Sequence, residues 1–307
     1  MPLPPILPLP AKGYESAIEL ATATGLLRGT LMSPPSGLCA QVVLIIAGSG
    51  PTDRDGNNPL LPGNNDCLKM LANELAIAGI ASVRYDKRGV GGSVRVDEAA
   101  LTFDDFVQDA ADWLALLRRE GRFDQVIVAG HSEGSLIGML AAERAAADGL
   151  VSIAGLAERA SNVLRWQLAG KLPAALARRN VAILQALERG ERVDDVPPGL
   201  MALYRPSVQP YLISWFKRVP AEVFARLAMP CLVLQGDADL QVGCDQAMAL
   251  RAANPAADWA VIEGMNHVLK IVADDPQSNF AAYGDPNLPI APGLVEALLR
   301  YLNALSR

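Results

Sequence analysis

Short apolar runs alternate with longer amphipathic stretches along the first half of the chain. Runs typical of strands buried on both faces of a sheet stand at 41–48 (QVVLIIAG), 80–86, 125–130 and 150–157. Segments with apolar residues at helical spacing lie between them, at 64–78, 101–120 and 133–147. Residues 17–32 indicate two further strands joined by a turn at Gly25, and Asn64 or Asn65 is available to cap the first helix. This alternation predicts an α/β fold with a mostly parallel central sheet covered by helices on both faces.

The alternation stops after Ala157. Residues 158–228 have the pattern of helices and turns, without a clear strand. Strand and helix patterns return later, at 230–239, 244–253, 258–263 and 292–306. The simplest interpretation is one core made of 1–157 (with 1–14 as an extended arm) and 229–307, with a helical cap or lid, 158–228, inserted after the sixth strand. Two separate domains are the alternative, but two late strands are too few to form a stable sheet of their own.

The composition suits a chain with a sizeable core. Of 307 residues, 51% are hydrophobic and 20% are charged, which disfavours gross disorder. The net charge of −6 argues against binding to nucleic acid. No run of about 18 apolar residues occurs, so no membrane span is expected. The N-terminus lacks the order of a secretory signal, so we expect a cytoplasmic protein, although a signal removed before residue 1 would leave no trace. The pattern does not indicate an oligomeric state.

The four cysteines are scattered along the chain, at Cys39, Cys67, Cys231 and Cys244. Because no C-x-x-C pair occurs, the spacing suggests neither a zinc site nor a dense disulfide framework. Free thiols that pack as small apolar residues are the favoured interpretation, and two long-range disulfides remain open. Neither a metal nor an organic cofactor is expected.

A G-x-S-x-G motif, Gly130-His131-Ser132-Glu133-Gly134, stands between a predicted strand and a predicted helix. In that context the serine occupies a tight, strained turn, and flanking glycines let neighbouring backbone pass without a Cβ clash. The turn raises the serine hydroxyl above the sheet edge, beside a helix N-terminus that favours negative charge. We therefore expect Ser132 to be a catalytic nucleophile.

A serine nucleophile needs a base at neutral pH, and the chain has two histidines. His131 precedes the nucleophile in the same turn and is interpreted as a packing or supporting residue. When the nucleophile lies on a strand-to-helix turn, the chain order is Ser, acid, His, and only His267 fits that order. The acid should follow the strand CLVLQ, where both Asp237 and Asp239 stand, and spacing alone does not decide between them.

An oxyanion in such a site needs two backbone donors. One is the N–H of Glu133, the residue after the nucleophile. The second is expected from the Gly48-Ser49-Gly50-Pro51 turn after the first buried strand, where we choose the N–H of Ser49. Asp53, Arg54 and Asp55 follow this turn, and we favour a structural ion pair there over a role in binding substrate, as for Asp86 and Arg88.

The ordered set GHSEG, LQGDAD and GMNH resembles the α/β-hydrolase superfamily over nearly the whole chain. The segments AGSGPTDRDGN (47–57) and RYDKRGVGGS (84–93) are similar to those of bacterial serine hydrolases grouped near serine aminopeptidases and carboxylesterases. The resemblance implies that Asp239 is the acid of the triad, with Asp237 as a turn residue. Ala47 replaces the histidine usual in that group, which leaves the Ser49 donor unaffected.

The inserted segment carries aromatic side chains that are sparse elsewhere. They are Trp166, Tyr204, Tyr211, Trp215 and Phe216. Some should face the serine and others form the core of the lid, and for the substrate pocket we choose Trp166, Tyr211, Trp215 and Phe216. The favoured function is a serine carboxylesterase that cleaves small-molecule esters with a medium apolar group through an acyl-enzyme. An aminopeptidase-like peptidase and a thioesterase would use the same triad. A non-catalytic binding protein with this fold is the alternative of another class.

Overall fold

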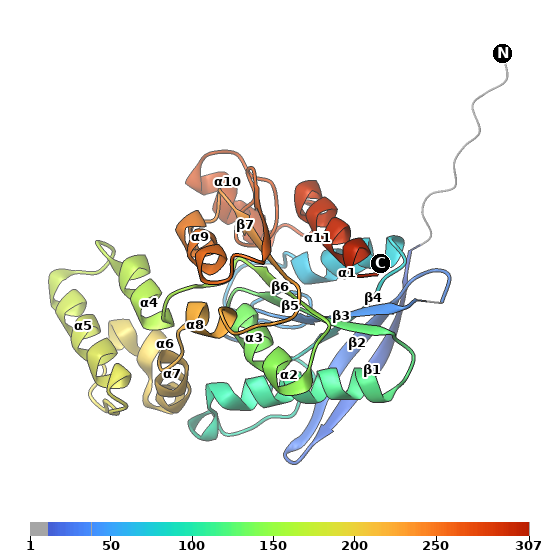
Figure 1. Ribbon diagram of the computed structural model, residues 1–307. Helices are drawn as coiled ribbons and strands as arrows, with labels where there is room; N and C mark the ends of the chain where they lie inside the picture. Colours follow the sequence, from blue (N-terminus) through green and yellow to red (C-terminus); the bar gives the residue numbers. More distant parts are fainter. Residues whose placement is uncertain (1–11, 38, 307) are drawn as a thin grey trace.

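The structure is a computed structural model that describes residues 12–37 and 39–306 (Figure 1). Its strands form one eight-stranded sheet in the order β1-β2-β4-β3-β5-β6-β7-β8. The strands are β1 (Tyr14–Thr22), β2 (Gly25–Ser33), β3 (Gln41–Ile46), β4 (Ala81–Tyr85), β5 (Gln125–His131), β6 (Gly149–Ile153), β7 (Cys231–Gly236) and β8 (Asp258–Ile262). From β4 to β8 every neighbouring pair is parallel, whereas the β1–β2 hairpin is antiparallel. The predicted α/β fold with a mostly parallel sheet is confirmed.

Helices cover both faces of the sheet, as the continuous apolar strands require. Strand β3 shows why, because Val42 and Leu44 face one apolar core while Val43 and Ile45 face the other. The first core is covered by α2 (Phe103–Arg119), α3 (Glu133–Ala145), α8 (Pro220–Phe224) and α9 (Cys244–Ala253), and the second by α1 (Cys67–Ile77) and α11 (Pro292–Leu305). The ends of the parallel strands are thereby held rigidly between two helical layers.

Residues 158–228, which we call the cap, are helical and connect β6 to β7. Their elements are α4 (Ala160–Leu168), α5 (Ala174–Glu188), η2 (Pro198–Leu200), α6 (Met201–Tyr204), η3 (Pro206–Val208), α7 (Gln209–Phe216) and α8. Figure 1 shows α4 to α7 gathered to one side of the sheet. The cap has an apolar cluster of its own, which includes Leu184, Leu200 and Tyr204. Because β7 pairs with β6, the strands on both sides of the cap belong to the same sheet.

Several boundaries differ from those expected from the pattern. The arm expected at 1–14 falls mostly outside the described residues, and Tyr14 already opens β1. Helix α1 begins at Cys67 with Asp66 as its N-cap residue, whereas Asn65 accepts a hydrogen bond from the Cys67 N–H at 3.0 Å. The strand expected at 150–157 ends at Ile153, because Ala154 takes a positive φ of 51°.

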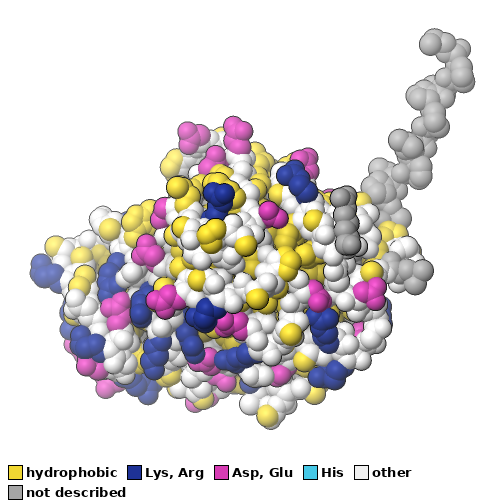
Figure 2. All heavy atoms as spheres, viewed as in Figure 1, with side chains coloured by type: hydrophobic (Ala, Val, Ile, Leu, Met, Phe, Trp, Pro, Cys, Tyr) yellow, Lys and Arg dark blue, Asp and Glu magenta, His cyan; other side chains and the backbone are white. Residues whose placement is uncertain are grey.

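The segment 268–290 contains two short helices, α10 (Pro276–Ala281) and η4 (Ala282–Gly284). One more 3-10 helix, η1 (Glu98–Ala100), precedes α2. All four cysteines are free, and two of them are only half-buried, at Cys39 and Cys244. No helix in the described ranges is long and apolar enough to cross a membrane. On the face shown in Figure 2, basic and acidic side chains are interspersed rather than separated by sign.

Candidate active site

Ser132 occupies a strained turn between β5 and α3. Its φ is +56° and its ψ −120°, a conformation that costs a non-glycine residue on the order of 1–3 kcal/mol. The flanking glycines leave room for backbone alone. A Cβ on Gly130 would lie 2.1 Å from the carbonyl oxygen of Gly134, and a Cβ on Gly134 would lie 2.3 Å from that of Ile46. The G-x-S-x-G motif therefore works as the sequence predicts, through steric space for a sharp turn.

His267 and Asp239 form a buried pair at the same edge of the sheet. His267 Nδ1 lies 2.7 Å from Asp239 Oδ2. The other carboxylate oxygen, Oδ1, accepts the N–H groups of Gln241 at 2.7 Å and Val242 at 2.9 Å. Burial raises the pKa of Asp239, but the charge of His267 and these hydrogen bonds outweigh it, so the pKa lies below the ordinary value. Asp239 is therefore an ionised partner that orients the imidazole.

Asp237, the other candidate for the acid, has a different task. Its side chain is exposed and its Oδ1 accepts the N–H of Gly264 at 2.6 Å. That bond ties the turn after β7 to the loop after β8, which carries His267. The structure thus pairs Asp239, and not Asp237, with the histidine.

His131 joins the turn of Ser132 to the loop of His267. It is buried, and its Nε2 donates to the backbone oxygen of His267 at 2.8 Å. The two imidazole rings lie 4.9 Å apart. Burial lowers the pKa of His131 to about 3, so its ring stays neutral. His131 therefore supports His267 through the backbone, which agrees with the supporting role expected for it.

The hydroxyl of Ser132 is the third part of the expected triad. Ser132 is half-buried and faces a cavity, and its Oγ makes no hydrogen bond to any described residue. Because catalytic hydrogen bonds are often long before substrate binds, a free hydroxyl on the turn whose His131 contacts His267 is compatible with a triad.

The turn after β3 lies directly against the nucleophile. A Cβ on Gly48 would come within 3.2 Å of the Ser132 Cβ, so this close approach needs glycine. Ser49 and Glu133 line the same cavity as Ser132. Within the part of the chain that the structure describes, neither the Ser49 N–H nor the Glu133 N–H has a hydrogen-bond acceptor. Both groups remain available to bind an oxyanion.

A cavity of about 720 Å³ opens at Ser132, between the core and the cap. Its walls are mostly apolar and include Leu101, Phe106, Leu156, Val163, Leu164, Leu203, Val208, Leu212 and Trp215. Tyr211 and Trp215 line it, as expected for a substrate pocket. They stand four residues apart on α7 and so share one face of the helix.

Two other aromatic residues lie elsewhere than expected. Phe216 is buried in the cap cluster with Leu212, because its position on α7 turns it away from the face of Tyr211 and Trp215. Trp166 is 61% exposed and lines a smaller neighbouring cavity instead. The aromatic count of the cap could suggest a pocket but not which rings face it.

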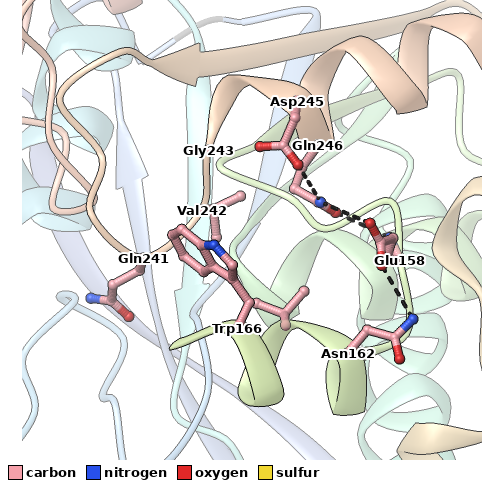
Figure 3. A pocket seen from close by; sticks show the side chains of 9 residues that line it. Glu158, Asn162, Trp166, Gln241, Val242, Gly243, Asp245 and Gln246 are labelled. Carbon is pink, nitrogen blue, oxygen red and sulfur yellow. Dashed lines mark hydrogen bonds between the residues drawn. The ribbon is translucent and has the colours of Figure 1, made fainter. Parts of the chain in front are cut away.

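That smaller cavity, of about 370 Å³, has an acidic wall (Figure 3). Gln246 donates to Asp245 at 2.8 Å and to Glu158 at 3.5 Å, and Asn162 donates to Glu158 at 3.1 Å. Figure 3 shows the Trp166 ring beside Val242, on the opposite side of this cavity. The two cavities share lining residues and therefore adjoin: Val163, Gln241 and Val242.

A buried polar cluster that the sequence pattern did not reveal lies along the cavity of the nucleophile. The Lys87 Nζ donates to the carbonyl oxygen of Gly48 at 2.5 Å and lies 3.7 Å from Glu133 Oε2. Tyr211 donates its hydroxyl to the other oxygen of Glu133, and burial followed by the charge of Glu133 raises the pKa of Tyr211 well above its ordinary value. Lys87 and Glu133 are each 3% exposed. No local motif marks a contact between residues so far apart in the chain.

The charged segment after the oxyanion turn is structural, as favoured. Arg54 contacts Asp86 at 2.7 Å, and Arg84 contacts Asp55 at 3.0 Å. Arg88 forms an ion pair with Asp109 on α2. The first two pairs tie the 53–55 segment to the end of β4, and the third ties the loop after β4 to α2, so that the loops around the site are fixed. Within the described residues no group of three or more His, Cys, Asp or Glu side chains is arranged to hold a metal ion.

Comparisons with known proteins find a matching family and a similar esterase. Residues 65–196 match the family described as serine aminopeptidase, S33. Esterase EstD of Thermotoga maritima is 30% identical over 259 residues, which are 83% of this chain and 61% of that protein, so the chain spans about three fifths of the relative's length.

Solved structures share the fold at low identity. GrgF, an α/β hydrolase from Penicillium sp. sh18, is 17% identical with a TM-score of 0.62, and the match covers 96% of this chain and 98% of that one. Est1E from Butyrivibrio proteoclasticus is 16% identical with a TM-score of 0.63, covering 94% and 98%. At these identities the likeness establishes the fold alone.

Proposed function

We propose that this chain, which has the fold of the α/β hydrolases, is a serine hydrolase that cleaves carboxylic esters through an acyl-enzyme. The observation that carries the proposal is the buried His267–Asp239 hydrogen bond beside the strained turn of Ser132. The name of the relative from Thermotoga maritima, an esterase, supports the choice of leaving group.

The proposed reaction has two steps. Ser132 Oγ attacks the acyl carbonyl while His267 takes its proton and Asp239 stabilises the imidazolium. The N–H groups of Ser49 and Glu133 bind the developing oxyanion. His267 then protonates the leaving alcohol and activates a water molecule, which releases the acid and restores the serine. No step needs a metal or an organic cofactor.

The proposed substrate is a small-molecule ester with a medium apolar acyl or alcohol group. A cavity of about 720 Å³ is in the range of pockets that hold drug-sized ligands. Its walls are largely apolar, with Tyr211 and Trp215 contributed by the cap. We propose that the cap acts as a lid over this cavity and that residues 1–157 and 229–307 form one catalytic core.

A panel of p-nitrophenyl esters of increasing acyl length tests the proposal on the purified chain. We expect turnover to be highest for medium chains, and we expect a fluorophosphonate probe to label the wild type but not Ser132→Ala. If no ester is cleaved while an aminoacyl amide or a thioester is, the proposed substrate class is wrong although the nucleophile stands. If the wild type is not labelled at all, the non-catalytic alternative takes its place.

A second candidate is an aminopeptidase, as the description of the matching family suggests. The acidic wall made by Glu158 and Asp245 favours it, because two carboxylates beside the main cavity suit a free amine. Aminoacyl p-nitroanilides, compared with their N-acetylated forms, separate the two functions. An aminopeptidase requires the free amine, whereas an esterase is indifferent to acetylation.

A further inference from the structure

We propose that Lys87 is a positioning residue of the oxyanion hole, which it holds in its active form by binding the back of the Gly48–Ser49 peptide. This inference rests on the proposed hydrolase function and extends it to a residue outside the triad. Lys87 is nearly fully buried, yet it lies in the loop after β4 and forms no part of the Ser132, His267 and Asp239 arrangement.

The argument starts from the geometry of one peptide bond. The carbonyl of Gly48 and the N–H of Ser49 belong to the same peptide unit, which is trans. In a planar trans peptide these two groups point in opposite directions. Lys87 and Ser49 line the same cavity. Because Lys87 Nζ donates to the Gly48 oxygen, the Ser49 N–H is directed away from the ammonium group and, within the described chain, is left free for an oxyanion. A rotation of this peptide would break the bond to Lys87 and withdraw the donor.

Glycine at the oxyanion turn makes such a fixing contact necessary. Gly48 lacks a Cβ so that it can approach Ser132, and Gly50 adopts a positive φ of 70°. Residues of this kind have more accessible backbone conformations than others, so the turn does not fix its own peptide planes. An ammonium group bound to the carbonyl restrains the plane and also polarises the amide, which strengthens the N–H as a donor.

The ammonium is itself held from two sides. Glu133 Oε2 lies 3.7 Å from the Lys87 Nζ, and the Phe106 ring lies below it with its centroid at 5.6 Å. Glu133 Oε2 has no hydrogen-bond donor of its own in the described chain, so Lys87 supplies the only countercharge recorded there. A buried carboxylate of this kind is costly without a cation.

Glu133 connects the two halves of the oxyanion hole. Its backbone N–H is the second expected donor, while its side chain holds the lysine that orients the first. One ion pair therefore links the turn after β3 to the start of α3, and Tyr211 extends the link to the cap. The spacing of the two donors depends on residues 87 and 133 together.

Single removal of Lys87 would leave Glu133 buried and unpaired, which is strongly destabilising, so the decisive variant neutralises both partners. We compare Glu133→Gln, which keeps the bond from Lys87 to Gly48, with the double variant Lys87→Met/Glu133→Gln, which loses it. Lys270→Met serves as the matched control, because Lys270 is also buried and also donates to a backbone oxygen, that of Asp285.

The measurements are kcat and KM for a p-nitrophenyl ester, the inhibition constant of a trifluoromethyl ketone, and the rate of fluorophosphonate labelling. Relative to Glu133→Gln, the double variant should lose about 10²-fold in kcat and in labelling rate, the size of one lost oxyanion donor, with KM little changed. The affinity for the ketone, whose adduct carries an oxyanion, should fall in parallel. Lys270→Met should keep its kcat even if its melting temperature falls.

Equal labelling rates and equal kcat in the double variant and Glu133→Gln would overturn the inference. It would also be overturned if kcat/KM and the affinity for a product alcohol fell by the same factor in the double variant. A crystal structure of the double variant gives an independent readout, and an unchanged Gly48–Ser49 peptide would also refute the proposal. If the wild type cleaves no ester but is labelled, the proposed ester substrate fails while the labelling rates still test Lys87. If the wild type is not labelled, the nucleophile assignment and this inference fail together.

Discussion

The turn of Ser132 and the cap differ in how tightly the chain constrains them. At the turn, one added Cβ on Gly130 or Gly134 would overlap backbone atoms, and the strand before it is paired on both sides. In the cap, helices pack through a separate apolar cluster, and ion pairs such as Arg189–Glu191 are exposed to solvent. Exposed pairs of this kind contribute little to stability, because solvent screens the two charges. The core is therefore built for precise chemistry, and the cap shapes the cavity with fewer constraints.

Removal of the candidate nucleophile or base from the core should cause the largest loss of activity. Ser132→Ala and His267→Ala should each lower kcat by up to about 10⁶-fold, and the double variant should be no worse, because the two residues act as one unit. Melting temperatures near that of the wild type would show that the fold is intact. Additive losses would contradict a shared mechanism for Ser132 and His267.

The two aspartates after β7 offer a sharper test within the core. Asp239→Asn should lower kcat by about 10⁴-fold, because the imidazole loses the carboxylate that sets its tautomer. Asp237→Asn keeps an oxygen for the Gly264 N–H and should change kcat little. Each variant differs from the wild type by one heavy atom of a side chain, and steady-state kinetics compares the two. Similar losses in both would contradict the assignment of Asp239 as the acid.

Trp215 and Phe216, neighbours on α7, test whether substrate contacts and the packing of the cap are made by different faces of this helix. Phe216→Ala should lower the free energy of unfolding by about 3–5 kcal/mol, since the ring is fully buried in the cap cluster. Trp215→Ala should instead enlarge the cavity and shift preference toward longer acyl chains by about tenfold in kcat/KM. Denaturant unfolding and the ester panel measure the two effects. A shift in chain-length preference with Phe216→Ala would contradict the division of the two faces.

A smaller effect is expected from the buried His131, which should make the stability of the fold depend on pH. In the unfolded chain His131 binds a proton below its ordinary pKa of 6.5, whereas burial keeps the folded ring neutral down to about 3. The unfolded state therefore holds more protons in this window, and stability falls by about 1.4 kcal/mol for each pH unit below 6.5. Urea unfolding at pH 7 and pH 5 should differ by about 2 kcal/mol for the wild type.

The variant His131→Gln should lose most of that difference, because the imidazole that burial keeps neutral is then absent. The pH interval is favourable for the measurement, because His131 and His267 are the only histidines of the chain. An undiminished pH dependence in His131→Gln would assign the effect to another group.

Patterns within short windows were sufficient to predict the fold, and they led to the choice of Ser132 and His267 as candidate catalytic residues. Continuous apolar runs, helical spacing and the two glycines around Ser132 are local signals, since each follows from the backbone geometry of a few consecutive residues. The choice between Asp237 and Asp239 was beyond spacing, because both follow the same strand and only the fold brings one of them to His267.

The supporting contacts were decided by tertiary structure alone. Lys87 contacts Gly48 and Glu133. His131 forms a hydrogen bond with the backbone of His267, and Phe216 packs in the cap cluster. Each of these depends on how separate elements lie against one another, and a hydrogen bond between residues 39 or 136 positions apart leaves no periodic trace in the chain. Local sequence therefore specifies which groups can react, whereas long-range packing decides which groups hold them in place.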